Sequence, residues 1–260
     1  MVNRFDTIDY IYDKTATFSL SASVLKIIAI VTMIIDHIGY LILNGKLYGF
    51  NDAVYQHVIT LPEAQKWIVL YNVCRIIGRI SFPIFAFLVV EGLLRTSSIF
   101  NYLFRLLILA IVSEIPYDLM IYNRFMYLGD QNVVFLYFIV VGLISIYRRI
   151  NAHPIFLTAM TLVAMIVSYF AKISYGPMGI LYMVYVYNMR FDKNLRTIGC
   201  GIISFIMSFY KNRYGVGALS AILIHLYNGK KGNIKLGNIP YIIYPLHMII
   251  IVIIIFISYI

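Results

Sequence analysis

The chain has 260 residues, of which 62% are hydrophobic, and a formal net charge of +10. Soluble domains are usually closer to half apolar, so the composition excludes an ordinary soluble protein and indicates one that crosses a membrane several times. The basic residues lie in short segments between apolar runs, which favours membrane topology and lipid headgroups, rather than nucleic acid, as the reason for the positive charge.

The N-terminal residues 1–20 are polar and charged, and they lack the basic-then-apolar order of a cleavable signal. We therefore expect residues 1–22 to form an N-terminal cytoplasmic segment and residues 23–260 to form a single transmembrane domain. The expected fold is all-α, a polytopic helical bundle with about nine or ten transmembrane helices.

The apolar runs predict nine spans, at residues 23–43, 67–93, 99–121, 132–147, 154–171, 176–189, 197–210, 215–228 and 239–260. A tenth crossing within residues 44–66 stays open. Spans 176–189 and 215–228 are short and contain glycine, which is typical of helices that surround a site inside a bundle.

The connecting segments indicate the orientation, because cytoplasmic loops carry an excess of Lys and Arg. If the N-terminus is cytoplasmic and the spans alternate, nine Lys and Arg fall in the inner loops and six in the outer loops. This bias favours a cytoplasmic N-terminus, although one missed helix would invert the second half of the assignment.

The first span, "SVLKIIAIVTMIIDHIGYLIL", carries three ionisable residues. Intramembrane charges are costly and usually mark functional sites. Lys26 and His37 are eleven residues apart, so they share a helix face about 16 Å apart along the axis. Asp36 points about 100° away and is expected to brace a neighbouring helix or orient a polar partner. The alternatives are a snorkelling anchor for Lys26 and a structural hydrogen bond for His37.

The second span contains "RIIGRISFPIFAFLVVEG", in which Arg75 and Arg79 share a face. Pro83 cannot donate a hydrogen bond to the carbonyl of Arg79, which predicts a kink and an adjoining cavity. Arg79 is a candidate for substrate contact and equally for an ion pair with Asp36 or Glu114.

The third span ends in "SEIPYDLM", which places Glu114 and Asp118 one turn apart on one face. Paired carboxylates can hold a cationic acceptor or raise the pKa of one another. The alternative is that they neutralise the arginines of the second span.

Three later motifs carry polar groups between or within spans. Asn132 in "QNVVF" can orient an acceptor or cap a helix. The loop "YNGKKG" offers Asn228, Lys230 and Lys231 to a phosphate, although a basic cytoplasmic loop is the ordinary explanation. The motif "YIIYPLH" contains Tyr244 and His247. Cys74 and Cys200 form no CxxC pattern, so no metal site or disulfide is expected.

These motifs resemble the TraX family in their order along the chain, from about Lys26 to His247. They are "LKIIAIVTMIIDHIGYLIL", "IGRISFPIFAFLVVEG", "RLLILAIVSEIPYDLM", "QNVVF", "YGPMG", "LYNGKKG" and "YIIYPLH". The family is named for a protein that acetylates the N-terminus of conjugative pilin. The lysine, ten residues and histidine of the first span also resemble a motif of the wider membrane acyltransferases.

The resemblance implies a multi-pass acyltransferase of the bacterial inner membrane that uses acetyl-CoA as acyl donor and no metal. Lys26 is implied as a contact for a CoA phosphate, His37 as the catalytic histidine, and Arg79 as part of the active-site cavity. A peptide N-terminus, a sugar amine or a hydroxyl fits as acceptor, and the oligomeric state is left open.

The resulting hypothesis assigns catalysis to His37, Asp36, Arg79, Glu114, Asp118 and Asn132, and donor binding to Lys26, Asn228, Lys230, Lys231, Tyr244 and His247. Neutral His37 would take the acceptor's proton, and Arg79 or Asn132 would stabilise the oxyanion. Two alternatives stay open: a secondary transporter with a buried charged relay, and a non-enzymatic assembly protein of the cell envelope.

Overall fold

The structure is a computed structural model and describes residues 19–46, 61–210 and 214–258. The described chain is helical with no strand, in agreement with the expected all-α bundle. The N-terminal segment and the open tenth crossing fall largely outside the described residues. The α-helices are α2 (Ala22–Lys46), α4 (Gln65–Gly78), α5 (Ser81–Arg95), α6 (Ile99–Tyr122), α7 (Val133–Ile150), α8 (Pro154–Phe170), α9 (Gly176–Asn188), α10 (Lys193–Tyr210), α11 (Leu219–His225) and α12 (Ile239–Ser258).

Five segments are long and apolar enough to cross a membrane by themselves: Ala22–Leu43, Gln65–Arg95, Ile99–Tyr122, Val133–Ile150 and Ile239–Ile257. Pro154–Phe170 and Val216–His225 are apolar but shorter. The chain is therefore a multi-pass membrane protein. The total of nine or ten crossings stays a prediction, because it depends on the shorter helices.

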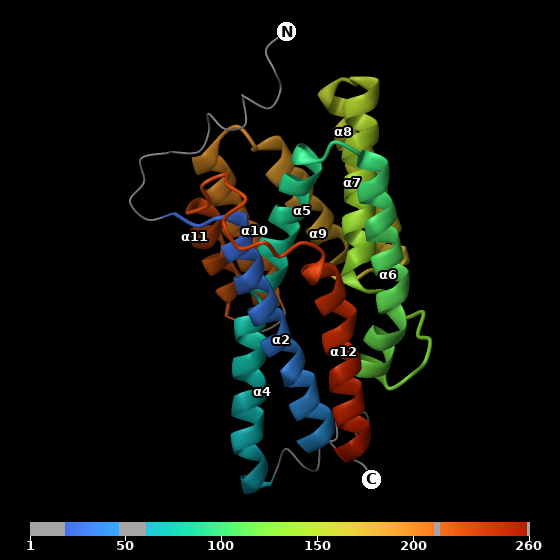
Figure 1. Cartoon of the computed structure of the whole chain (residues 1–260), viewed down its shortest axis with the longest axis vertical. Helices are drawn as coiled ribbons and strands as arrows, with labels where there is room; N and C mark the ends of the chain where they lie inside the picture. The colour runs from blue at the N-terminus through green and yellow to red at the C-terminus, as the bar shows by residue number, and fades with distance from the viewer. Residues whose placement is uncertain (1–18, 47–60, 211–213, 259–260) are drawn as a thin grey trace.

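The helices lie roughly along the long axis of the molecule, and consecutive helices run in opposite directions (Figure 1). α4 and α5 are the exception, because α5 continues α4 after a break at Arg79 and Ile80. There the backbone N–H groups of these two residues donate to the carbonyls three positions earlier, at 3.1 and 3.2 Å. Pro83 lies in the first turn of α5 and has no backbone N–H, so it cannot donate a hydrogen bond to the carbonyl of Arg79. The kink predicted from this proline is confirmed.

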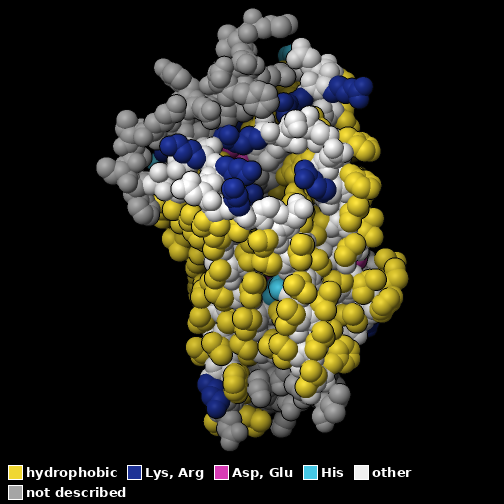
Figure 2. Space-filling model, viewed as in Figure 1, with side chains coloured by type: hydrophobic (Ala, Val, Ile, Leu, Met, Phe, Trp, Pro, Cys, Tyr) yellow, Lys and Arg dark blue, Asp and Glu magenta, His cyan; other side chains and the backbone are white. Residues whose placement is uncertain are grey.

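The surface separates into an apolar belt and a basic end. Large hydrophobic side chains such as Ile166, Phe170 and Ile253 are more than half exposed, as expected for groups that face lipid. Figure 2 shows hydrophobic side chains over the middle of the molecule and Lys and Arg gathered near the end where α2 begins. We call this the basic end; it carries Lys26, Arg95, Arg148, Arg149, Lys230 and Lys231. The opposite end is called the far end.

A close approach of α2 and α4 depends on Gly78. A Cβ at this position would lie 2.0 Å from Asp36 Oδ1, which is closer than any real contact. We expect Gly78→Ala to force α2 away from α4 and to reduce stability by about 1–3 kcal/mol, the usual cost of overpacking. The thermal unfolding midpoint in detergent measures this effect.

Gly142→Ala on α7 is the matched control for this prediction. A Cβ at Gly142 would meet only Leu103 Cδ2, at 3.9 Å, so alanine should be neutral or stabilising through its higher helix propensity. Equal unfolding midpoints for the two variants would contradict the proposed close contact.

Candidate active site

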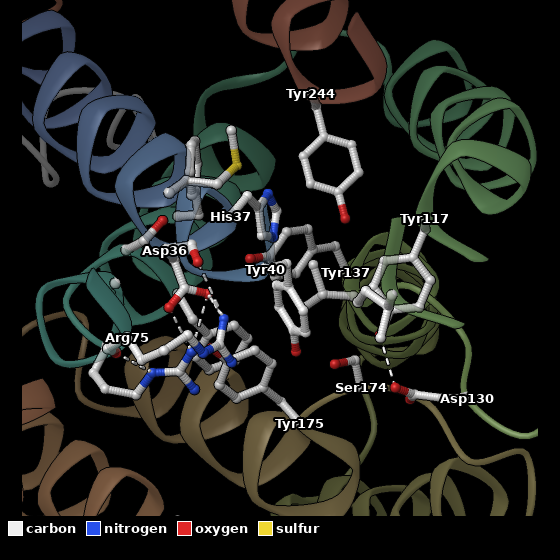
Figure 3. A pocket seen from close by; sticks show the side chains of 18 residues that line it. Asp36, His37, Tyr40, Arg75, Tyr117, Asp130, Tyr137, Ser174, Tyr175 and Tyr244 are labelled. Atoms are coloured by element: carbon white, nitrogen blue, oxygen red, sulfur yellow. Dashed lines mark hydrogen bonds and ion pairs between the residues drawn. The ribbon is translucent and has the colours of Figure 1, made fainter. Parts of the chain in front are cut away.

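A small polar cavity lies beside the break between α4 and α5. Its volume is about 120 Å³, and it is enclosed by parts of α2, α4, α5, α6, α7 and α12 and by the segments that precede α7 and α9. The side chains that face it are shown in Figure 3. The polar residues that line it are Asp36, His37, Tyr40, Arg75, Arg79, Ser81, Tyr117, Asp130, Tyr137, Ser174, Tyr175 and Tyr244.

His37 is hydrogen-bonded to a second histidine, and this contact determines which ring nitrogen of His37 carries the proton. Its Nδ1 lies 2.5 Å from Nε2 of His247, and the two rings are parallel within 3°. The Nδ1 atom of His247 lies 2.7 Å from the carbonyl oxygen of Ile243. A carbonyl only accepts, so His247 is protonated at Nδ1 and its Nε2 is an acceptor.

It follows that His37 donates from Nδ1, and that its Nε2 carries a lone pair. His37 lines the cavity, and Nε2 makes no hydrogen bond within the described part of the chain. This is the arrangement of a general base: one ring nitrogen is held by an orienting partner and the other is available for a proton.

Asp36 is buried and binds two arginines from the neighbouring helix segment. Its Oδ2 lies 2.6 Å from Nη1 of Arg75, and its Oδ1 lies 2.9 Å from Nη2 of Arg79. Arg79 also donates from Nε to the carbonyl of Arg75, at 3.1 Å. The ion pair with Asp36, one of the two roles considered for Arg79, is therefore present.

The cluster keeps one excess positive charge on the cavity wall, since two guanidinium groups face one carboxylate. Nη2 of Arg75 and Nη1 of Arg79 make no hydrogen bond within the described chain, and both residues line the cavity. The guanidinium of Arg75 also stacks over the ring of Tyr40, at 4.4 Å. These donors can therefore stabilise a negative oxygen that forms beside His37.

The other side of the cavity carries Asp130 and several tyrosines. Asp130 Oδ2 accepts hydrogen bonds from the hydroxyls of Tyr117 and Tyr122, at 2.7 and 2.8 Å. The Tyr175 ring packs parallel to Phe82, with 3.7 Å between the ring centres. Burial raises the pKa of Tyr175, an effect that Arg79 partly opposes, so its phenol stays protonated.

Three of the predicted catalytic residues do not line the cavity and instead hold the backbone. Asn132 caps α7, since its Oδ1 accepts from Val134 N at 3.0 Å. Glu114 Oε2 accepts from the backbone and side-chain nitrogens of Asn132. Asp118 Oδ2 accepts from Tyr127 N at 2.7 Å. The capping role considered for Asn132 is present, and neither carboxylate pairs with Arg75 or Arg79.

Four of the residues predicted to bind the donor meet at the basic end. The backbone nitrogens of Ala22 and Ser23 donate to the carbonyls of Lys230 and Lys231, at 2.9 and 3.1 Å. This ties the loop after α11 to the start of α2, and it brings Lys231 within electrostatic reach of Lys26. The Asn228 side chain accepts from Lys230 N and so shapes the loop.

A cavity of about 480 Å³ lies at this junction, lined by Ser21, Ser23, Asn228, Lys230 and Gly232 among others. Gly232 has φ of +87°, and a Cβ there would lie 2.1 Å from Ser23 Oγ, so only glycine fits. The hydroxyls of Ser21 and Ser23 and the ammonium of Lys230 can bind a phosphate group, whereas the N–H groups of Ala22 and Ser23 already donate to carbonyls. The residues present therefore fit the phosphates of CoA.

Tyr244 and His247, also predicted to bind the donor, lie elsewhere. Tyr244 lines the cavity at His37, and His247 is hydrogen-bonded to His37. α12 thus contributes to the cavity at His37 rather than to the junction that contains Lys230 and Lys231.

The sequence hypothesis did not include several residues that line this cavity. Tyr40, Arg75, Tyr117, Asp130, Tyr137 and Ser174 were not selected. Arg75 had the clearest signal, because it shares a face with Arg79 inside an apolar span. Asp130 lies in the loop between α6 and α7, where no periodicity distinguishes it.

A comparison with protein families finds one match, to the family described as TraX protein, over residues 21–255. The match begins before the lysine cluster and ends after His247, so it includes both cavities. No curated protein and no solved structure shows a significant match to the chain. The resemblance found in the sequence motifs is confirmed: the chain belongs to the TraX protein family.

Proposed function

We propose that this protein is a membrane acyltransferase that moves an acetyl group from acetyl-CoA to an amine or hydroxyl acceptor. The observation that carries the proposal is the fixed tautomer of His37, which presents an unprotonated Nε2 to a buried cavity beside two arginines. Membership of the TraX family, associated with pilin acetylation, supports the same reaction class.

The chemistry assigned to His37 is proton transfer. Its Nε2 takes the proton of the acceptor as the acceptor attacks the thioester carbonyl, and returns it to the departing sulfur. His247 holds the Nδ1 proton of His37 and stabilises the ring when it becomes cationic, so we assign it a positioning role.

The two arginines are assigned to the oxyanion that develops on the carbonyl. Their unpaired terminal nitrogens face the cavity, and Asp36 keeps both side chains in place. Fixed donors in a site that excludes water stabilise such an oxygen strongly. Asn132 is committed to the cap of α7, so the arginines are the better candidates for this task.

The donor is assigned to the basic end. Lys26 and His37 lie on the same helix, about 16 Å apart along its axis, and this matches a donor whose nucleotide stays at the membrane surface while its thioester reaches the cavity. The gathering of Lys and Arg at this end supports a cytoplasmic location for it, and hence a cytoplasmic N-terminus in the bacterial inner membrane.

A transporter with a buried charged relay is less well supported. Asp36 is engaged by two arginines, and Glu114 and Asp118 accept hydrogen bonds from backbone nitrogens that shape the loop before α7. Such fixed carboxylates suit a static scaffold better than a series of proton-exchanging groups.

The test of the proposed function uses the full-length protein in lipid nanodiscs with acetyl-CoA. We expect slow release of free CoA thiol without an acceptor and faster release with one, because water is a poor acceptor. Absence of both CoA binding and thiol release would remove the proposal. Substrate flux into liposomes without acetyl-CoA would favour the transporter instead.

Substitution of the lysines assigned to donor binding should lower CoA affinity more than it lowers the rate of acyl transfer. We expect Lys26→Met and Lys231→Met each to weaken CoA binding about tenfold, the effect of losing about 1.4 kcal/mol of charge attraction. Lys66→Met, in the first turn of α4 at the far end, is the matched control and should leave CoA affinity unchanged. Equal affinities for all three variants would refute the assignment of the donor to the basic end.

A further inference from the structure

We propose that a pocket at the turn between α5 and α6 binds the phosphate headgroup of an anionic phospholipid, and that Arg105 is its cationic contact. The pocket shares no lining residue with the two cavities assigned to acyl transfer. The inference therefore does not depend on the proposed function, and its test uses no acetyl-CoA.

The pocket contains one arginine and otherwise neutral side chains. Its volume is about 400 Å³, and it is lined by Thr96, Ser97, Ser98, Asn101, Phe104 and Arg105. No acidic side chain of the described chain lines it, so the guanidinium alone determines the sign of the electrostatic potential there. Such a pocket attracts an anion.

Two of the polar side chains shape the turn, and two others are available to a ligand. The Thr96 hydroxyl donates to the carbonyl of Ser98 at 3.2 Å, and Ser98 Oγ accepts from Asn101 N at 3.3 Å. The side chains of Ser97 and Asn101 are exposed and make no hydrogen bond within residues 19–46, 61–210 and 214–258. A hydroxyl and an amide beside a guanidinium can donate to several oxygens of one phosphate.

Arg105 has no counter-charge among the described residues. It is exposed on α6 and forms no ion pair there, whereas Arg95, at the end of α5, binds Glu91 at 3.1 Å. The ring of Tyr241, at the start of α12, lies 5.9 Å from the guanidinium carbon of Arg105. An arginine in an apolar span is costly without a partner, and a phosphate supplies one with matching geometry.

The depth of Arg105 is that of a lipid headgroup. It is six residues after the start of α6 at the basic end, or about 9 Å along the axis, and helical side chains lean back toward the N-terminus. The guanidinium therefore extends toward the membrane surface. Phe100, Phe104 and Ile108 on this part of α6 are 75%, 53% and 45% exposed, as expected for contact with acyl chains. These surroundings favour a phospholipid over a soluble phosphate.

The experiment titrates the full-length protein in dodecyl maltoside micelles with phosphatidylglycerol, phosphatidylcholine or inorganic phosphate. The thermal unfolding midpoint reports binding, because a ligand of the folded state raises it. We expect phosphatidylglycerol to raise the midpoint more than phosphatidylcholine, and inorganic phosphate to leave it unchanged. Arg105→Gln should weaken the apparent affinity for phosphatidylglycerol about fivefold, the usual effect of one basic residue beside anionic lipid.

Arg149→Gln is the matched control, because Arg149 is exposed at the end of α7 on the basic end and does not line the pocket. It removes the same charge and should keep the affinity for phosphatidylglycerol. An equal loss of affinity in both variants would overturn the inference, since the effect would then come from general surface charge.

A second variant fills the pocket with an internal counter-charge. Asn101 and Arg105 are one helical turn apart, so the carboxylate of Asn101→Asp can pair with the guanidinium and exclude a phosphate. The fold should be kept, because a negative charge in the first turn of a helix is favourable. We expect the affinity for phosphatidylglycerol to fall about fivefold, as in Arg105→Gln.

The Asn101→Asp variant decides the question if Arg105→Gln proves unstable without lipid. Wild-type affinity for phosphatidylglycerol in Asn101→Asp would overturn the inference. Equal stabilisation of the wild type by phosphatidylglycerol and by phosphatidylcholine would also overturn it, as would stabilisation by inorganic phosphate that equals that by phosphatidylglycerol.

Discussion

His37→Gln is expected to reduce acyl transfer by about 10²–10⁴-fold, the range that a positioned general base contributes. Glutamine retains a donor for His247 Nε2 but cannot accept a proton at neutral pH, so the fold and CoA binding should be kept. Thiol release with acceptor measures the effect, and the thermal unfolding midpoint and CoA affinity report on folding. His153→Gln is the matched control, because His153 is exposed at the start of α8.

The position of His247 allows a sharper version of this test. In His247→Gln the amide oxygen can still accept from His37 Nδ1, whereas in His247→Leu it cannot. We expect the glutamine variant to keep more activity than the leucine variant, with a similar KM for the acceptor. Wild-type turnover by His37→Gln would contradict the role of His37, and equal activity of the two His247 variants would contradict the tautomer assignment.

Asp36→Asn is expected to destabilise the protein by about 3–5 kcal/mol, because it removes the counter-charge of two buried guanidinium groups. The side chains of Arg75 and Arg79 would then repel each other next to the helix break. Activity should fall with stability, since both oxyanion donors would lose their position. The unfolding midpoint in detergent, followed by the intrinsic fluorescence of Trp67, measures the loss.

A second substitution separates charge from packing in this cluster. In the double variant Asp36→Asn with Arg75→Gln, the buried cluster keeps the net charge of +1 that it has in the wild type. We therefore expect its stability to lie between that of the wild type and that of Asp36→Asn. A double variant less stable than Asp36→Asn would show that hydrogen-bond geometry, rather than net charge, dominates.

The sequence indicated the parts of the fold and site that depend on local properties. The apolar runs predicted the helices, and the cost of charges in lipid selected Asp36, His37 and Arg79. Pro83 predicted the break between α4 and α5. Each of these follows from residues close together in the chain.

The remaining part depends on contacts between distant segments. His247 is 210 residues from His37, and nothing local distinguishes a partner for His37 from an ordinary buried histidine. Glu114 and Asn132 were selected as polar groups in or beside spans, yet their contact with each other commits both to the start of α7. Asp130 lies in a loop, where only the three-dimensional structure places it against the cavity.

Under the proposed function, the shared placement of Lys26 and His37 on α2 would make this helix a molecular ruler. Both groups lie on one helix, so the distance between the donor's nucleotide and its thioester would be fixed at about 16 Å. A truncated donor such as acetyl-pantetheine would then reach the histidine but lose its contacts with the lysines. Selectivity among acetyl carriers would follow from this length, in addition to any pocket that surrounds the acetyl group.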